Sequence, residues 1–171
     1  MLDLDMMIDE EKLQTRIGEM AEEIDQVYNG EKIVVICVLR GAIYFMVDLT
    51  KKMKTVIETD FIRVSSYVGT ESTGNIRMTL DISENIEGRD VLIVEDIIDT
   101  GFTLKYLRDY LMTKNPKSLR IAVLADKEER RKVDVPVDFV GFKIPDKFVV
   151  GYGFDDDNAY RNLPYIGSKK G

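Results

Sequence analysis

Residues 91–104 contain the side chains whose types and spacing have the clearest chemical use. An apolar run is followed by the adjacent carboxylates Glu95 and Asp96, and Asp99 comes shortly after them. Carboxylate oxygens are the protein ligands that Mg²⁺ prefers. A Thr-Gly-Phe-Thr turn at residues 100–103 then begins an amphipathic segment, and such a turn at the start of a helix presents free N–H groups to phosphate. The segment therefore predicts a site for a phosphorylated substrate complexed with Mg²⁺.

Apolar runs predict the strands that position this site, at residues 33–39, 90–95, 119–124 and 135–142. The first run is continuously apolar, which is typical of a strand covered on both faces of a parallel sheet. Another strand begins at residues 61–64, and residues 76–82 alternate apolar and polar side chains as in a half-buried strand. The polar, glycine-containing residues 65–75 between these two strands predict a hairpin with a long, mobile tip.

Amphipathic segments predict the helices that cover the sheet, at residues 13–27, 42–53 and 102–114. In the first segment, one apolar face is formed by Leu13, Ile17, Met20, Ile24 and Val27. The alternation of strands and helices predicts an open, mostly parallel α/β sheet, and a chain of this length is most simply one domain, residues 1–171. Ligands of such sheets bind outside the carboxyl ends of the strands, where residues 39–41, 95–96 and 125–127 lie.

The composition narrows the possible chemistry. The chain has no histidine and one cysteine, Cys37, which we expect to be a small buried side chain within its apolar run. Acid–base work must then fall to Asp, Glu, Lys or Tyr, and a disulfide framework is excluded. The net charge of −7 argues against binding of nucleic acid, which needs a basic surface. No secretion signal and no run long enough to span a bilayer is visible, so we expect a cytoplasmic protein without membrane association.

The nine-residue pattern E-D-I-I-D-T-G-x-T after an apolar strand resembles the phosphoribosyl-pyrophosphate (PRPP) signature of type I phosphoribosyltransferases. The sequence of this motif is most similar to that of the hypoxanthine-guanine phosphoribosyltransferase family. The similarity extends over nearly the whole chain. The resemblance implies the type I phosphoribosyltransferase fold. This fold is a mostly parallel open sheet flanked by helices, with a small hood and a mobile lid loop.

The resemblance also implies roles for the signature residues. Glu95 and Asp96 would lie near the ribose hydroxyls and the Mg²⁺ that these hydroxyls chelate. Asp99 would be the base that takes the proton from purine N7. The cradle for the 5′-phosphate would consist of Thr100, Gly101 and Thr103 with the backbone N–H groups of their turn.

Two further segments resemble parts of the family's active site. Residues 38–42 resemble the pyrophosphate loop, although Arg40-Gly41 alone reads as an ordinary strand-to-helix turn. The pyrophosphate ligands implied by the resemblance are Leu39, Arg40, Gly41 and the distant Arg161. Ser66 and Tyr67 resemble the beginning of the lid, which closes over the reaction centre and excludes water.

The purine pocket is assigned by the same resemblance. Lys127 matches the lysine that donates to O6 of a 6-oxopurine, whereas composition alone would make it a solvated lysine at the start of a charge run. Phe148 would stack on the purine, and the backbone of Val149 would meet its Watson–Crick edge. Asp155, the first carboxylate of an Asp-Asp-Asp run, would be a ligand of the metal and of the base.

The activity implied by the resemblance is purine salvage. The 5-phosphoribosyl group of PRPP would pass to hypoxanthine or guanine, giving IMP or GMP plus pyrophosphate, with Mg²⁺ as cofactor. The resemblance further implies a homodimer or a homotetramer. A phosphoribosyltransferase that prefers xanthine is an alternative within the same family.

Two alternatives come from other classes of protein. A response-regulator receiver also ends an apolar strand in Mg²⁺-binding carboxylates, but its acidic pair belongs near the N-terminus, whereas this pair is in the middle of the chain. A PRPP-sensing regulator on the same fold would bind RNA or carry a DNA-binding domain. The acidity of the chain disfavours RNA binding, and no residues are left over for a DNA-binding domain. PRPP-dependent consumption of hypoxanthine would distinguish the enzyme from both.

Overall fold

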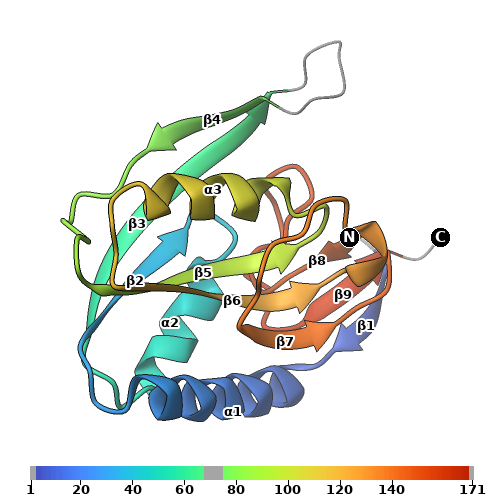
Figure 1. Cartoon of the computed structure of the whole chain (residues 1–171). Helices are drawn as coiled ribbons and strands as arrows, with labels where there is room; N and C mark the ends of the chain where they lie inside the picture. The colour runs from blue at the N-terminus through green and yellow to red at the C-terminus, as the bar shows by residue number, and fades with distance from the viewer. Residues whose placement is uncertain (1–2, 68–74, 170–171) are drawn as a thin grey trace.

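The computed structural model describes residues 3–67 and 75–169, and its main feature is a six-stranded sheet (Figure 1). The strand order is β4-β3-β2-β5-β6-β7. The strands are β2 (Ile33–Val38), β3 (Ile57–Tyr67), β4 (Asn75–Leu80), β5 (Asp90–Ile98), β6 (Ser118–Asp126) and β7 (Phe139–Lys143). All neighbouring strands are parallel except β3 and β4, which form an antiparallel hairpin at one edge. The expected mostly parallel α/β sheet is confirmed.

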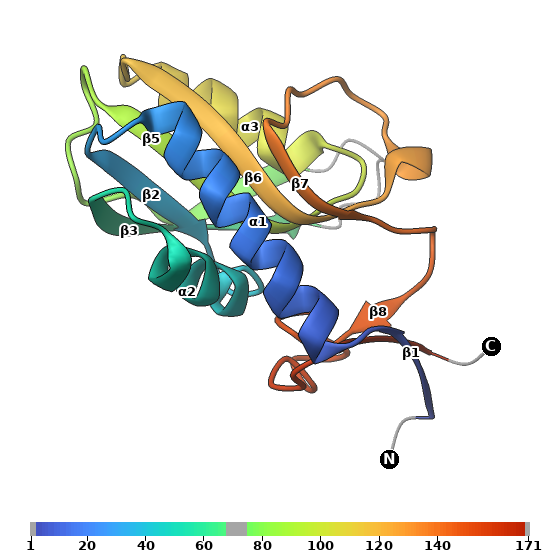
Figure 2. The same ribbon diagram turned by 90° about the horizontal axis from the view of Figure 1, so that it is seen from below.

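Helices cover both faces of this sheet. The helices α1 (Glu10–Tyr28) and α2 (Ile43–Lys52) lie on one face, and α3 (Phe102–Met112) lies on the other (Figures 1 and 2). A hydrophobic core lies on each face of the sheet, and alternate residues of β2 belong to different cores. Val35 packs with α1 and α2, and Val34 packs with α3. Burial on both faces explains why this strand is continuously apolar in sequence.

A second, three-stranded sheet brings the two ends of the chain together. It has the order β1-β9-β8 and is antiparallel throughout, with β1 (Leu4–Ile8), β9 (Ile166–Lys169) and β8 (Val149–Val150). The small sheet corresponds to the expected hood. It holds the segment after β7 beside the main sheet (Figure 1).

Several boundaries differ from those predicted by the sequence. Val27 is 46% exposed although it was assigned to the apolar face of α1, and the neighbouring Tyr28 is buried in its place. The strand β3 begins at residue 57 rather than at residue 61. The strand β7 begins at residue 139 rather than at residue 135, since Pro136 has no N–H group to pair with a neighbouring strand.

The strand register aligns the carboxyl ends that carry the expected site. Cys37 of β2 pairs with Val94 of β5, and Ile98 of β5 pairs with Asp126 of β6. The turns that follow these strands therefore meet at one edge of the sheet.

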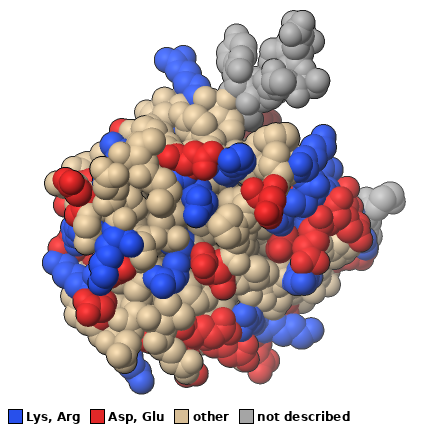
Figure 3. Space-filling model, in the orientation of Figure 1, with Lys and Arg blue, Asp and Glu red and all other residues tan. Residues whose placement is uncertain are grey.

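On the face seen in Figure 3, acidic and basic side chains are interspersed. The helices within the described ranges lack the combination of length and apolarity needed to cross a membrane.

Candidate active site

Two adjacent carboxylates lie at the carboxyl end of β5. Glu95 is 7% exposed, and its Oε1 accepts a hydrogen bond of 2.9 Å from the backbone N–H of Asp96. Both residues line a hollow of about 230 Å³ whose wall continues along the chain to Leu104. The structure thus places the acidic pair and the expected phosphate turn in one concave site.

Burial perturbs the ionisation of this acidic pair. Removal from water raises the pKa of Glu95 well above its ordinary value, and the negative charge of Asp96 raises it further. The pKa of Asp96 is raised by burial, while the guanidinium of Arg161 acts in the opposite direction. A buried and a half-buried carboxylate, both with raised pKa values, make a site that a cation would stabilise, which fits the oxygen-ligand chemistry of Mg²⁺.

The turn after β2 packs directly against this acidic pair. An ideal Cβ atom on Gly41 would overlap Oδ2 of Asp96 and would stand 3.4 Å from Nη1 of Arg161. The carbonyl of Gly41 in turn lies where a Cβ atom on Gly153 would be, and Gly153 has a φ of +101°. The Leu39–Arg40 peptide bond before the turn is cis. Glycine at both positions allows the two backbones and the carboxylate to approach this closely.

Two arginines expected at the pyrophosphate are linked to one loop near this turn. Arg161 donates through Nη1 to the carbonyl of Gly153 at 2.5 Å, and its Nη2 lies 2.8 Å from Oδ1 of Asp155. Arg40 is exposed and donates at 3.2 Å to Oδ1 of Asn158, whose backbone N–H donates at 2.8 Å to Oδ2 of Asp155. The pair Arg40 and Arg161 therefore supplies positive charge at the same corner of the site.

The turn expected to bind phosphate leads into α3. Gly101 has a φ of +91°, and an ideal Cβ atom on it would stand only 2.9 Å from the carbonyl oxygen of Val133. Within the described ranges no side chain caps the start of α3, so its first N–H groups lack such a partner. Thr100 and Thr103 line the same hollow. Backbone N–H groups and hydroxyls at a helix N-terminus form an arrangement suited to phosphate.

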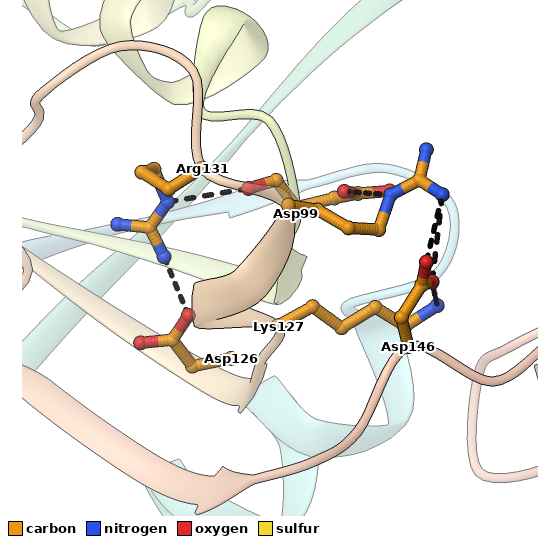
Figure 4. A network of polar contacts seen from close by, with 6 residues as sticks. Asp99, Asp126, Lys127, Arg131 and Asp146 are labelled. Carbon is orange, nitrogen blue, oxygen red and sulfur yellow. Dashed lines mark hydrogen bonds and ion pairs between the residues drawn. The ribbon is translucent and has the colours of Figure 1, made fainter.

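Asp99 follows β5 and is held by two arginines of the segment after β6. Its Oδ1 accepts a hydrogen bond of 2.6 Å from Nε of Arg130, and its backbone carbonyl accepts one of 3.2 Å from Nε of Arg131 (Figure 4). Nη1 of Arg130 also lies 3.4 Å from each carboxylate oxygen of Asp146. The Asp99 side chain remains 38% exposed, which leaves it accessible to a ligand.

The pairing of β5 with β6 places Lys127 close to Asp99. The backbone N–H of Lys127 donates to the carbonyl of Ile98 at 3.0 Å, so Lys127 and Asp99 follow neighbouring strand ends. The Lys127 side chain is only 10% exposed, and its ammonium group lies 3.8 Å from Oδ1 of Asp146. Figure 4 shows the side chains of Lys127 and Asp99 both extending toward the part of the network where Asp146 lies.

The aromatic side chain expected at the purine is exposed. Phe148 is 51% exposed, and the ammonium group of Lys169 lies 4.8 Å from the centroid of its ring. The carbonyl of Phe148 accepts a hydrogen bond of 3.3 Å from the backbone N–H of Lys169. Val149 is buried and pairs with Ser168 in the small sheet. The small sheet thus fixes the backbone that carries the aromatic ring.

The expected metal ligands are not assembled into a set of three protein ligands. The described residues contain no group of three or more Asp, Glu, His or Cys side chains that could hold an ion. Glu95 and Asp96 are adjacent, whereas Asp155 is paired with Arg161. Mg²⁺ is commonly held by one or two carboxylates together with water and substrate phosphates, and the acidic pair fits this mode.

The expected lid lies largely outside the described residues. Ser66 and Tyr67 form the end of β3, where they pair with Ile76 and Asn75 of β4. Residues 68–74, which follow them, lie outside the described residues. The structure therefore places the beginning of this segment at the tip of the edge hairpin.

Three residues that the sequence did not indicate hold the groups expected at the purine. Arg130, Arg131 and Asp146 all contact Asp99 or Lys127, and Arg131 also pairs with Asp126 at 2.5 Å (Figure 4). The two arginines fall in a run of charged residues, which by itself indicates a solvated surface. The available signal was the position of this run directly after a strand end at the site.

Comparison with known proteins gives a consistent result. A family model described as "Phosphoribosyl transferase domain" matches residues 5–157. The hypoxanthine-guanine-xanthine phosphoribosyltransferase of Tritrichomonas foetus is 46% identical over 96% of this chain and 91% of that protein. The hypoxanthine phosphoribosyltransferase of Salmonella typhimurium is 47% identical over 96% of this chain and 94% of that protein.

Solved structures agree with these sequence relatives. The crystal structure of a hypoxanthine-guanine phosphoribosyltransferase from Bacillus anthracis has a TM-score of 0.95 and 47% identity, covering 99% of this chain and 100% of that one. A hypoxanthine phosphoribosyl transferase from Trypanosoma cruzi has a TM-score of 0.92 and 41% identity, covering 97% of this chain and 91% of that one. That structure concerns the role of the C-terminal region in oligomeric state and enzymatic activity.

Proposed function

The chain belongs to the phosphoribosyl transferase domain family, and from this premise we propose that it salvages 6-oxopurine bases. It transfers the 5-phosphoribosyl group of PRPP to hypoxanthine or guanine, giving IMP or GMP plus pyrophosphate. The names of its relatives support this class of substrate, because hypoxanthine occurs in all four cited above and guanine in two of them.

The observation that carries the choice of base is the proximity of Lys127 to Asp99. A lysine ammonium only donates hydrogen bonds, and an ionised carboxylate only accepts them. The neighbouring O6 and N7–H of a 6-oxopurine require a donor and an acceptor in this order. Adenine has an amino group in place of O6, so it would meet the lysine with another donor.

The phosphoribosyl donor occupies the remainder of the site. Backbone N–H groups of the turn at residues 100–103 and the hydroxyls of Thr100 and Thr103 bind the 5′-phosphate. Arg40, Gly41 and Arg161 bind the pyrophosphate. Phe148 stacks on the purine, and the Val149 backbone contacts its Watson–Crick edge.

The chemical step exchanges one bond at ribose C1 for another. The bond from C1 to the pyrophosphate oxygen breaks, the bond from C1 to purine N9 forms, and the N7 proton passes to the carboxylate of Asp99. The arginines stabilise the charge that develops on the leaving pyrophosphate, and Lys127 and Phe148 orient the base. No covalent nucleophile is required, and burial raises the pKa of the Cys37 thiol to about 12, which keeps it unreactive.

Glu95 and Asp96 are the residues that would hold Mg²⁺. When bound, the ion would neutralise negative charge on the pyrophosphate oxygens. Asp155, which is paired with Arg161, would join these ligands only after exchanging its partner. Ser66 and Tyr67 would close over the bound substrates and exclude water.

The direct test of this function is product formation. The protein is incubated with PRPP, Mg²⁺ and hypoxanthine, and IMP and pyrophosphate are quantified. We expect the two products in equal amounts and in proportion to the hypoxanthine consumed. Binding of PRPP without consumption of the base would indicate a PRPP-sensing protein instead.

Three further properties complete the proposal. The enzyme acts in the cytoplasm as a single domain. It forms a homodimer or homotetramer, which sedimentation of the purified protein tests. Addition of xanthine to the assay determines whether it shares the third substrate named for the Tritrichomonas foetus relative.

A further inference from the structure

Arg130 bridges two carboxylates on the purine side of the site. Its Nε donates to Oδ1 of Asp99 at 2.6 Å, and its Nη1 lies 3.4 Å from both carboxylate oxygens of Asp146. Asp146 also lies 3.8 Å from the ammonium group of Lys127. The guanidinium of Arg130 thus contacts Asp99 directly and is linked to Lys127 through Asp146. The proposed function assigns both Asp99 and Lys127 to the purine.

The segment that carries Arg130 is anchored on both sides. At its start, the backbone N–H of Lys127 donates to the carbonyl of Ile98 at 3.0 Å. At its end, Arg131 contacts the carbonyl of Asp99, and the N–H groups of Lys132 and Val133 donate to the carbonyl of Thr100 at 2.9 and 3.2 Å. Arg130 lies between these anchors in the short 3₁₀ helix η1 (Glu128–Arg130), so its position is set by the site.

The two carboxylate oxygens of Asp99 differ in their contacts, so one can orient the side chain while the other accepts a proton. Arg130 engages Oδ1, and no hydrogen-bond donor to Oδ2 occurs within the described ranges. A carboxylate held through one oxygen keeps its orientation while the second oxygen accepts a proton. The same arrangement, a base oriented by a third group, recurs in enzymes whose proton acceptor must be aligned with its substrate.

We propose that Arg130 is a positioning residue for Asp99, and that Asp146 fixes its guanidinium. The proposal rests on the proposed function, in which Asp99 accepts the N7 proton. Arg130 acts through Asp99 and does not itself touch the purine. Exchange of Arg130 should therefore slow the transfer step and leave PRPP binding unchanged.

A contribution to folding alone would give a different result. The side chains of Arg130, Asp99 and Asp146 are 45%, 38% and 44% exposed. Exposed ion pairs contribute little to stability, because water screens them and ordering the side chains costs entropy. Loss of Arg130 should thus shift the unfolding temperature little, so an effect on the rate would reflect the site.

The test measures the single-turnover rate with saturating PRPP, Mg²⁺ and hypoxanthine. Arg130→Gln should lower this rate on the order of 10- to 100-fold, in the range of coupling between contacting residues, with the dissociation constant of PRPP unchanged. The matched control is Lys132→Gln, which removes the same charge from an exposed side chain of the same segment. This control should react at the rate of the wild type.

A double-mutant cycle with Asp99→Asn isolates the positioning role. If Arg130 acts through Asp99, adding Arg130→Gln to Asp99→Asn should slow the reaction by less than about twofold further. Full multiplication of the two losses, or a wild-type rate for Arg130→Gln, would overturn the proposal. Failure of the proposed function looks different, because the wild-type protein would then form no IMP at all. A wild-type rate for Asp99→Asn would instead remove Asp99 from the role of base.

Discussion

An ideal Cβ atom on Gly41 would overlap the carboxylate of Asp96, so the turn after β2 and the acidic end of β5 are in direct contact. The turn would bind the leaving pyrophosphate, and the carboxylate belongs to the pair that would hold Mg²⁺. This contact joins the two halves of the proposed PRPP site in the absence of substrate.

Gly41→Ala should therefore impair PRPP binding, because Asp96 must move to make room for the methyl group. We expect the dissociation constant of PRPP, measured by calorimetry, to rise at least about tenfold, a loss of roughly 1.4 kcal/mol. The control is Gly18→Ala in α1, where an added Cβ atom meets only a lysine side-chain carbon at 4.0 Å. Equal affinity of the Gly41→Ala protein and the control would contradict the assigned contact.

Burial of Glu95 beside Asp96 should make the folded protein less stable at a pH where Glu95 is ionised. Burial and the charge of Asp96 raise the pKa of Glu95 well above 4.5 in the folded protein. The folded state then holds this proton more tightly than the unfolded state. The stabilising contribution is full below the unfolded pKa and is lost as the pH rises through the folded pKa.

Glu95→Gln stays uncharged, so it should unfold at a higher temperature than the wild type at about pH 8 in the presence of EDTA. The difference should shrink as the pH falls toward the ordinary pKa of a glutamate. Calorimetric scans across this range measure it. A variant less stable than the wild type at high pH would show that the folded protein tolerates the ionised pair without cost.

Asp99→Asn should retain the fold and PRPP binding while turnover falls, because the geometry survives and the proton acceptor is lost. General acid–base groups typically contribute about 10²- to 10⁴-fold. Steady-state rates with hypoxanthine and guanine, compared with circular dichroism spectra, provide the measurement. Unchanged turnover with both bases would remove Asp99 from the role of base.

The central sheet could be predicted from the sequence because its strands are buried on both faces. The run at residues 33–39 has no other simple interpretation than a covered strand, and its observed end at Val38 differs by one residue. The start of β3 was missed because it carries Glu58 and Asp60. Glu58 is paired with Lys32 and Arg89, and Asp60 accepts backbone N–H groups of residues 83 and 84, contacts that depend on the tertiary fold.

The small sheet could not be located for a related reason. Strands β1 and β9 lie at opposite ends of the chain and are only four to five residues long, so their pairing depends on contacts that no local pattern contains. The candidate site residues divide in the same way. The end of an apolar strand indicated Glu95 and Asp96, and the resemblance to a family added Gly41. The contact of Arg130 with Asp99 depends on the tertiary fold, which brings the segment after β6 against the end of β5.

Lys127 provides the most discriminating test of the pocket. Lys127→Ala should weaken the use of hypoxanthine and guanine by roughly 1.5 to 3 kcal/mol, the range for a hydrogen bond to a charged group. PRPP affinity should be affected much less. The control Lys132→Ala should change neither the use of the base nor the affinity for PRPP. A Lys127→Ala protein that loses PRPP affinity and keeps its use of the base would show that this lysine belongs to another part of the site.

The central claim, transfer to a 6-oxopurine, is tested most directly by the kcat/KM of the wild-type protein for adenine, guanine, hypoxanthine and xanthine at saturating PRPP and Mg²⁺. A pocket built around a buried hydrogen-bond donor should discriminate strongly against a base that cannot accept this hydrogen bond. The loss in kcat/KM should be far larger than the loss caused by removing one methylene group from a substrate. We predict efficient use of hypoxanthine and guanine and almost no use of adenine. A preference for adenine would contradict the account, because Lys127 and Asp99 could not then be reading O6 and N7–H.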